Sequence, residues 1–455
     1  MRIRDPLGRK GNIVVGLDVG TTKICAIVGE VRGGKTDIIA IGSAPSTGLR
    51  KGVVINIEST VDSIKKAVRD AEAMAGIEIK SVYVGIAGGH IKGFESYGAV
   101  GIKGKEVKPQ DVERAIDSAS VVYVPLDREV LHVIPTEFIL DGQDGIKDPV
   151  GMAGVRLEVK VHIVTGAVSS VQNLLKCCER AGIEVIDIVL EPIASAAAVL
   201  TEDEKDLGAA LVDIGGGTTD IAIYKDGSLR HTAVLALGGN HFTNDISIGL
   251  RIPVQEAERI KKKYGCAITS MVDEAEEMDV AGADKQVRKI PRRYIAEIIQ
   301  PRCEELTELI KREIENSSGL EPGLSGVILT GGASLLAGLD RLMEANLGLS
   351  VRIGMPDGIE SSCASNSPLF QSNVNPVRNL KFLNGVNNPM YSTGVGLILH
   401  SIDGEPVPNA FGINGDMFNG IFDRMKEWVR NLLGVNGHEL RGKSRMLSGS
   451  MRQRI

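Results

Sequence analysis

The sequence predicts an α/β protein made of two related halves that face each other across a cleft. Residues 14–28 and 209–224 each run through an apolar strand, an aspartate, a glycine turn, a Thr-Thr pair and a second apolar strand. A third apolar run ends in a Gly-Gly pair at residues 331–332. Short apolar runs on both sides of a glycine turn are typical of β-hairpins. With 455 residues, the chain exceeds one ordinary core, so we expect two or more domains.

The second hairpin carries the turn residues Gly215, Gly216, Gly217 and Thr218, shortly after Asp213. Consecutive glycines let backbone N–H groups point into one concavity, which suits phosphate oxygens. Because a carboxylate repels phosphate, we expect Asp213 to hold a metal ion through water. Many hairpins contain glycines, so this turn alone is a weak signal.

The first hairpin repeats the same order with Asp18, Gly20, Thr21, Thr22 and Lys23. The lysine adds a positive point charge that suits a polyphosphate. The repetition indicates that each half offers one phosphate-binding turn and one acid to a shared cleft.

The third glycine element, Gly331 and Gly332, stands between an apolar run and a segment with helical periodicity. Without side chains, the backbone there can approach a flat ligand closely, and the start of a helix favours negative charge. Two phosphate turns followed by an adenosine turn resemble the actin-like ATPase superfamily. This resemblance implies ATP as the ligand and Mg²⁺ as its metal.

The composition disfavours several other classes of protein. A net charge of −6 argues against nucleic acid as the main partner. The six cysteines form no C-x-x-C pair, so we expect reduced thiols and not metal ligands or disulfides. Residues 1–12 lack the apolar segment of a signal peptide, and no apolar run is long enough to span a bilayer.

Strands and helices alternate between these motifs. Apolar runs predict strands at residues 38–41, 81–87 and 184–189, and apolar periodicity predicts helices at residues 61–76, 109–119 and from 171 onward. A further helix opens at Glu191 with proline in its first turn. The small residues that follow would let the two halves cross closely.

The second half continues with helices expected from residue 238, over 256–265 and over 295–314. Glu258 and Lys261 are three residues apart and share one helix face. Their spacing alone favours a solvated ion pair over a ligand contact.

Two segments break the alternating pattern. Residues 361–388 contain no acidic residue and are rich in Asn and Ser, which predicts an inserted, disordered loop. Residues 401–415 contain glycines and prolines and are typical of a linker. Beyond this linker, the apolar residues of one amphipathic helix share a face, among them Phe418, Ile421, Phe422, Met425, Trp428, Val429 and Leu432.

Together these features resemble the FtsA family, the bacterial cell-division relatives of actin. The resemblance rests on the three glycine motifs, on the blocks at residues 132–143, 149–162, 293–302 and 388–397, and on the terminal amphipathic helix. It covers residues 12–399 and that helix. The loop at 361–388 is longer than the family connection, and the chain continues past the helix with a basic tail.

The resemblance implies an actin-like ATPase fold of four subdomains. Subdomain 1A would span residues 12–85 and 166–203, subdomain 1C 86–165, subdomain 2A 204–239 and 321–400, and subdomain 2B 240–320. A linker at 401–415, a membrane-binding amphipathic helix at 416–434 and a basic tail at 435–455 would follow.

The resemblance also assigns roles to the motif residues. Asp18 and Asp213 would hold the hydration shell of Mg²⁺, and Glu191 would orient water near the metal, so these three are the expected catalytic residues. Glu258 and Lys261 would face the ribose and adenine of ATP. The phosphates would meet Gly20, Thr21, Thr22, Lys23 and Gly215 to Thr218, and the base would be covered by Gly331 and Gly332.

Members of this family tether filaments of the tubulin-like protein FtsZ to the cytoplasmic face of the inner membrane. The resemblance therefore implies FtsZ as a partner, contacted through residues 240–320 by basic side chains such as Arg292, Arg293 or Arg302. It also implies self-association into actin-like protofilaments, anionic phospholipid as the membrane partner, and recruitment of later division proteins. ATP hydrolysis would be slow at most.

Two alternatives remain at this stage. A sugar or carboxylate kinase on the same fold would need a substrate base beside the γ-phosphate, and no isolated acid in the sequence fits that role. A pilus-assembly or chaperone-type ATPase would lack the lipid-binding terminal helix. A phosphate-transfer assay against common metabolites would separate the kinase from the scaffold.

We predict that the double variant Trp428→Glu and Phe422→Glu no longer binds anionic liposomes but still binds ATP. A large apolar side chain gains up to ~1.5–3 kcal/mol when it is fully buried, and the charged replacement removes this gain. Co-sedimentation with vesicles measures the effect. High salt should weaken wild-type binding only partly, because the basic tail supplies part of the attraction. Unchanged sedimentation of the double variant would show that this helix is not the anchor.

Overall fold

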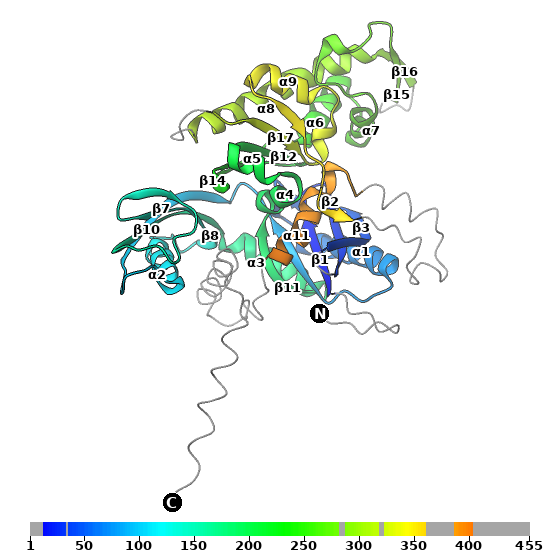
Figure 1. The fold of residues 1–455 in the computed structure, drawn as a ribbon. Helices are drawn as coiled ribbons and strands as arrows, with labels where there is room; N and C mark the ends of the chain where they lie inside the picture. Colours follow the sequence, from blue (N-terminus) through cyan, green and yellow to red (C-terminus); the bar gives the residue numbers. More distant parts are fainter. Residues whose placement is uncertain (1–11, 33–34, 282–286, 318–322, 361–385, 404–455) are drawn as a thin grey trace, which may run out of the picture. The chain divides into compact units, whose positions relative to one another are not determined.

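The computed structural model describes residues 12–32, 35–281, 287–317, 323–360 and 386–403 (Figure 1). The expected amphipathic helix, the basic tail and most of the 361–388 loop lie outside these residues. The chain divides into two compact units. The first contains residues up to 95, 123–134 and 162–402, and the second contains residues 96–122 and 135–161.

The first half of the first unit is built on a six-stranded sheet with the order β11-β6-β1-β2-β3-β19. β1 (Asn12–Val19) pairs antiparallel with β2 (Lys23–Arg32), which confirms the first predicted hairpin. β1 also pairs parallel with β6. The other strands are β3 (Lys35–Pro45), β6 (Ser81–Ile86), β11 (Glu184–Leu190) and the short β19 (Ile359–Glu360). A small hairpin, β4 (Leu49–Arg50) and β5 (Val53–Val54), follows β3.

Helix α1 (Ile57–Ala75) packs against β3 of this sheet. The Asn56 side chain accepts a hydrogen bond from the Ser59 amide at its start, and Gly76 ends it with φ of 69°, so both ends have regular caps. A Cβ on Gly42 of β3 would lie 1.8 Å from the Ala67 carbonyl oxygen, so only glycine permits this approach. Helix α3 (Val168–Arg180) packs beside α1.

The second half repeats this arrangement in a five-stranded sheet with the order β14-β13-β12-β17-β18. β12 (Ala209–Ile214) pairs antiparallel with β13 (Thr219–Lys225) and parallel with β17 (Gly326–Thr330). β14 (Ser228–Leu235) and β18 (Val351–Ile353) form the two edges. Each half therefore has a hairpin whose first strand is also parallel to a later strand, which confirms the two related halves predicted from the sequence.

Helices cover this second sheet and share one core with it. Phe242, Ile299 and Leu339 are fully buried in that core, on α6 (Gly239–Leu250), α8 (Arg292–Asn316) and α9 (Leu339–Leu347). α7 (Val254–Tyr264), the 3₁₀ turn η1 (Thr269–Met271) and the hairpin β15 (Glu277–Ala281) and β16 (Val287–Pro291) extend the same half. A 3₁₀ turn, η2 (Gly332–Leu335), separates β17 from α9, where the sequence predicts a helix directly after Gly332.

The second unit contains most of a four-stranded sheet with the order β7-β10-β8-β9, and one helix. The strands are β7 (Lys92–Gly101), β8 (Arg128–Leu140), β9 (Gln143–Ile146) and β10 (Arg156–Ala167). Helix α2 (Pro109–Ser120) begins with proline and buries Val112, Ala115 and Ile116. The ranges of this unit fall inside the predicted subdomain 1C.

Two helices of the first unit cross closely beside Asp213. α4 (Glu191–Val199) follows β11, and α11 (Ser392–Asp403) follows the 3₁₀ turn η4 (Pro389–Tyr391). A Cβ on Gly396 of α11 would lie 1.7 Å from the Ala194 carbonyl oxygen of α4. Small residues thus permit the close crossing that the sequence indicates. The short helix α5 (Glu202–Leu207) follows α4.

Two predicted boundaries need correction. Val386 is buried in the core between α4, β12 and α11, so the predicted loop at 361–388 does not include its last residues. Helix α11 reaches Asp403, so the linker expected from residue 401 starts later. The apolar pattern continues to Ile402, whose side chain packs on the same core. Among the described helices, none has the length and apolar character needed to cross a membrane.

We predict that Gly396→Ala destabilises the first unit, because the new methyl group must push α4 and α11 apart. Such overpacking lowers the free energy of unfolding by ~1–3 kcal/mol or more. Thermal unfolding followed by circular dichroism measures the effect, with Gly89→Ala as the control because a Cβ there meets nothing within 4 Å. Equal melting temperatures for the two variants would contradict the close crossing.

Candidate functional site

The first glycine turn joins β1 to β2. The Gly20 amide donates to the Lys23 carbonyl at 3.1 Å, and this bond closes the turn. Asp18 is buried at the end of β1. The Thr21 hydroxyl accepts from the Gly52 amide at 3.0 Å, so the turn is fixed from outside the hairpin as well.

The second glycine turn joins β12 to β13 in the same way. The Gly215 amide donates to the Thr218 carbonyl at 3.0 Å. The carbonyls of Gly215 and Gly216 accept from the amides of Gly239 and Asn240, at 2.9 and 2.8 Å. The first turn of α6 therefore sits on the second glycine turn and holds it in place.

The two glycine turns, predicted to face each other across a cleft, contact each other directly. A Cβ on Gly216 would lie 1.8 Å from the Thr22 hydroxyl oxygen, and one on Gly217 would lie 2.8 Å from that of Thr21. Asn240 reinforces this contact, because its side-chain oxygen accepts from the Thr22 hydroxyl at 3.5 Å. Asn240 was not among the residues predicted for the site, since only the fold brings α6 to the first turn.

Four acids cluster where these turns meet: Asp18, Glu191, Asp213 and Asp220. Burial raises the pKa of Asp18 to about 6, with repulsion from Asp213 adding to it and Lys23 opposing it. Burial, followed by repulsion from the other three carboxylates, raises the pKa of Glu191 well above its usual range. Burial also raises the pKa of Asp213. The four acids thus outnumber the one lysine that opposes these shifts, and burial disfavours their ionised forms.

Asp220 is the acid that the sequence analysis missed. It lies directly opposite Asp213 in the β12–β13 register and is buried. Burial and repulsion from Asp213 raise its pKa to about 8. The signal was present in the motif, because residues at equal distance from a hairpin turn face each other across the strands.

The donor set of this cluster suits a magnesium ion held through water. Carboxylate oxygens are the ligands that Mg²⁺ prefers, and Mg²⁺ usually keeps several waters. The Oδ1 atom of Asp220 is buried without a hydrogen-bond partner in the described part of the chain. Within the same residues, no three His, Cys, Asp or Glu side chains are placed to hold a metal directly.

Lys23 contacts a segment far away in the sequence. Its Nζ donates to the Met390 carbonyl at 2.7 Å and lies 4.1 Å from the centre of the Tyr391 ring. The first glycine turn is therefore joined to the residues that lead into α11.

Glu258 and Lys261 form the expected ion pair on α7, at 2.7 Å, but it is not a solvated surface pair. The two side chains are only 26% and 12% exposed. Lys261 also donates to the Gly239 carbonyl at 3.0 Å and to the Thr243 hydroxyl at 2.9 Å. Burial alone would raise the pKa of Glu258, but Lys261 and the Thr243 hydroxyl hold it below its usual range. The pair thus stands beside the second glycine turn.

The third glycine element lies against the acids. Gly331 has φ of 85°, and a Cβ on it would come within 2.3 Å of the Asp213 Oδ1 atom. Its amide donates to the Pro389 carbonyl at 3.2 Å. A Cβ on Gly332 would meet only Met390, at 3.9 Å, so this residue offers an open backbone surface. The structure thus brings all three predicted glycine elements into one site.

The two hairpin-bearing halves, with acids at matching strand ends, define an actin-like ATPase fold. The profile described as "Cell division protein FtsA" matches residues 210–396, and that described as "SHS2 domain inserted in FTSA" matches residues 88–165. "Cell division protein FtsA" of Pseudomonas aeruginosa is 43% identical over 430 residues, covering 93% of this chain and 98% of the relative. The Bacillus subtilis protein of that name is 40% identical, covering 85% and 82%. The chain belongs to the FtsA family of cell division proteins.

A solved structure with the same fold is the "PilM-PilN type IV pilus biogenesis complex". Its matching chain has a TM-score of 0.59 at 19% identity, covering 88% of this chain and 99% of that one. At this identity the likeness shows the fold alone. The family resemblance predicted from the sequence is confirmed, and with it a role in cell division.

Proposed function

We propose that this cell-division protein binds ATP with Mg²⁺ between its two glycine turns and acts as a membrane-bound scaffold for FtsZ. The observation that supports nucleotide binding most directly is the cluster of four acids at the contact of two glycine turns. A buried excess of carboxylates is unfavourable without a cation. A phosphate-bearing ligand that arrives with its metal supplies this positive charge.

Each group of residues has a separate task in this proposal. The backbone N–H groups of the turns and Lys23 bind phosphate oxygens. Asp18 and Asp213 hold the waters of Mg²⁺, which neutralises phosphate charge when bound. Glu258 and Lys261 face the ribose and adenine, and Gly331 and Gly332 cover the base.

The same electrostatics support slow hydrolysis. Burial and the neighbouring carboxylates raise the pKa of Glu191 well above its usual range, which disfavours its ionised form while no cation is close. A general base must be ionised before it can accept a proton from water. We therefore assign Glu191 the orientation of a water molecule, and the main role of the protein is that of a scaffold.

We predict that Asp213→Asn abolishes the Mg²⁺-dependent part of ATP binding, because the amide keeps the shape of the side chain but removes its charge. Isothermal titration calorimetry with and without Mg²⁺ measures this part directly. Asp226→Asn is the matched control. This residue lies in the exposed β13–β14 turn with φ of 54°, a conformation that asparagine tolerates. Wild-type affinity of Asp213→Asn in Mg²⁺ would contradict the proposed site.

For the FtsZ contact, the structure changes which basic residues are plausible. Arg292 pairs with Glu276 at 2.8 Å, Arg302 pairs with Asp245 at 2.7 Å, and Arg293 pairs with a nearby glutamate. An acidic FtsZ tail would have to compete with these intramolecular carboxylates. We therefore place the contact elsewhere within residues 240–320.

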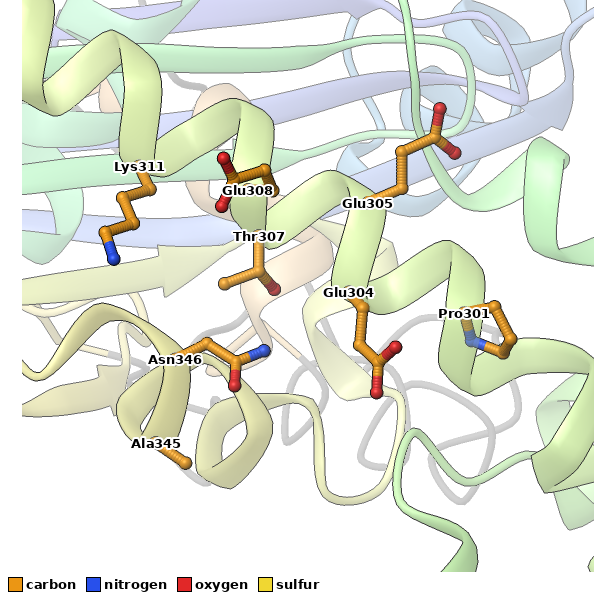
Figure 2. A pocket seen from close by; sticks show the side chains of 8 residues that line it. All are labelled: Pro301, Glu304, Glu305, Thr307, Glu308, Lys311, Ala345 and Asn346. Carbon is orange, nitrogen blue, oxygen red and sulfur yellow. The ribbon is translucent and has the colours of Figure 1, made fainter.

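The groove between α8 and α9 is equally unsuitable for an acidic peptide. Figure 2 shows the side chains that line this cavity of about 740 Å³. Three of them are glutamates and one is a lysine; the lining residues are Pro301, Glu304, Glu305, Thr307, Glu308, Lys311, Ala345 and Asn346. The negative charge there would repel an acidic tail.

The junction of α6 and α7 fits such a peptide better. Ile248 is 76% exposed and Val254 is 54% exposed, and the exposed Arg251 stands between them in the chain. Two exposed apolar side chains and an exposed arginine in the same short segment would match a peptide that carries both acidic and apolar residues.

We predict that Arg251→Glu weakens binding of the FtsZ C-terminal peptide at least several-fold, because it turns an attraction into a repulsion. Fluorescence anisotropy of a labelled peptide measures the affinity. Lys311→Glu makes the same charge change in the α8–α9 groove and should leave affinity unchanged. The opposite order of effects would move the contact to the groove, and loss of binding in neither variant would exclude both surfaces.

The remaining parts of the proposal rest on the sequence. Residues 416–434 would lie in the membrane interface on the cytoplasmic face of the inner membrane, attached to the body through the linker after α11. Self-association into protofilaments would place many such helices on one surface, and their combined attachment would be far tighter than that of one helix. Later division proteins would join this assembly.

A further inference from the structure

Asp213 is held by two hydroxyl groups from outside its own hairpin. The Ser195 hydroxyl donates to Asp213 Oδ2 at 2.7 Å, and the Thr393 hydroxyl donates to the same oxygen at 3.3 Å. The two hydroxyl oxygens are 2.9 Å apart. All three side chains are buried. We call this group the hydroxyl clamp.

The clamp joins three separate elements of the fold. Asp213 lies on β12, Ser195 on α4 and Thr393 in the first turn of α11. The two helices cross closely, as the Gly396 contact with Ala194 shows. The clamp therefore depends on the helix crossing and not on local chain geometry.

The clamp also fixes which way the carboxylate faces. Rotation about the last bond of an aspartate side chain is soft, so an unrestrained carboxylate samples a broad range of angles. Both hydroxyls bind Oδ2, and Oδ1 faces the Gly331 backbone. The acid is thus held in one orientation before any ligand arrives, which is the condition for a well-defined water position around a metal.

We propose that Ser195 and Thr393 are positioning residues that orient Asp213 toward the water shell of the nucleotide's Mg²⁺. This inference rests on the proposed function, since it concerns the same metal. The affinity for Mg²⁺ would be higher with a carboxylate that needs no reorientation on binding. Loss of either hydroxyl should weaken Mg²⁺-dependent binding and leave metal-free nucleotide binding nearly unchanged.

A purely structural role makes a different prediction. If Thr393 mattered only as a packing group, its shape would decide the outcome. Thr393→Val keeps the shape and removes the hydroxyl, whereas Thr393→Ser keeps the hydroxyl and removes a methyl group. A positioning role requires that serine rescues and valine does not.

The experiment measures ATP affinity by calorimetry in EDTA and in excess Mg²⁺ for the full-length protein. Ser195→Ala and Thr393→Val should each lower the Mg²⁺-dependent gain in affinity about tenfold, the effect of one hydrogen bond to a charged group. Thr393→Ser should keep the gain within about twofold of wild type by the same reasoning. Two variants on different helices test one interaction, so a folding defect in one leaves the other informative.

Thr307→Val is the matched control. Its hydroxyl is also buried, and it donates to the Cys303 carbonyl within α8, away from the acids. It should bind ATP like wild type in both buffers. A melting curve for each variant shows whether it is folded.

The outcomes separate this inference from the function on which it rests. If Ser195→Ala and Thr393→Val both keep the wild-type gain in ATP affinity from Mg²⁺, the positioning role is overturned. An equal loss of that gain in Thr393→Ser and Thr393→Val would overturn it as well. If wild-type protein gains no affinity from Mg²⁺, the proposed magnesium site itself is wrong and the inference falls with it.

Discussion

The structure of this site depends on the burial of four carboxylates beside one lysine. Taking charged groups out of water is unfavourable unless hydrogen bonds and opposite charges replace the lost hydration. Asp213 obtains its hydrogen bonds from Ser195 and Thr393, while Asp220 keeps one oxygen without a partner among the residues that the structure describes. The glycine turns and the helix crossing surround this cluster of acids. Burial raises the pKa values of these acids.

Close backbone approach is the second constraint, and it follows from the first. The acids come from two halves of the chain, so both halves must reach the same small volume. Gly216 and Gly217 let the two turns touch, and Gly396 lets α11 touch α4. A methyl group at any of these positions would separate the parts that supply the charges.

The sequence predicted the elements whose signals are local. The hairpins were readable from glycine turns flanked by apolar runs, and the end of α1 from Gly76, whereas its start at Ile57 lies four residues before the predicted position. The roles of Ser195, Asn240 and Thr393 were not readable, because each contacts the site only through packing between segments 18 to 218 residues apart. Predictions about the residues after α11 rest on the sequence, through the linker composition, the amphipathic pattern, the basic tail and the family resemblance.

The contacts of the residues at the start of α11 have a mechanical consequence. Residues 389–393 touch Lys23, Asp213 and Gly331, and α11 continues from them without a break to Asp403. Its 12 residues form a stiff rod of about 18 Å. A tilt of about 5° at the end beside the glycine turns would move the far end of such a rod by ~1.5 Å. If the proposed nucleotide site is right, a small movement at the glycine turns would thus be transmitted along α11 to its far end at Asp403.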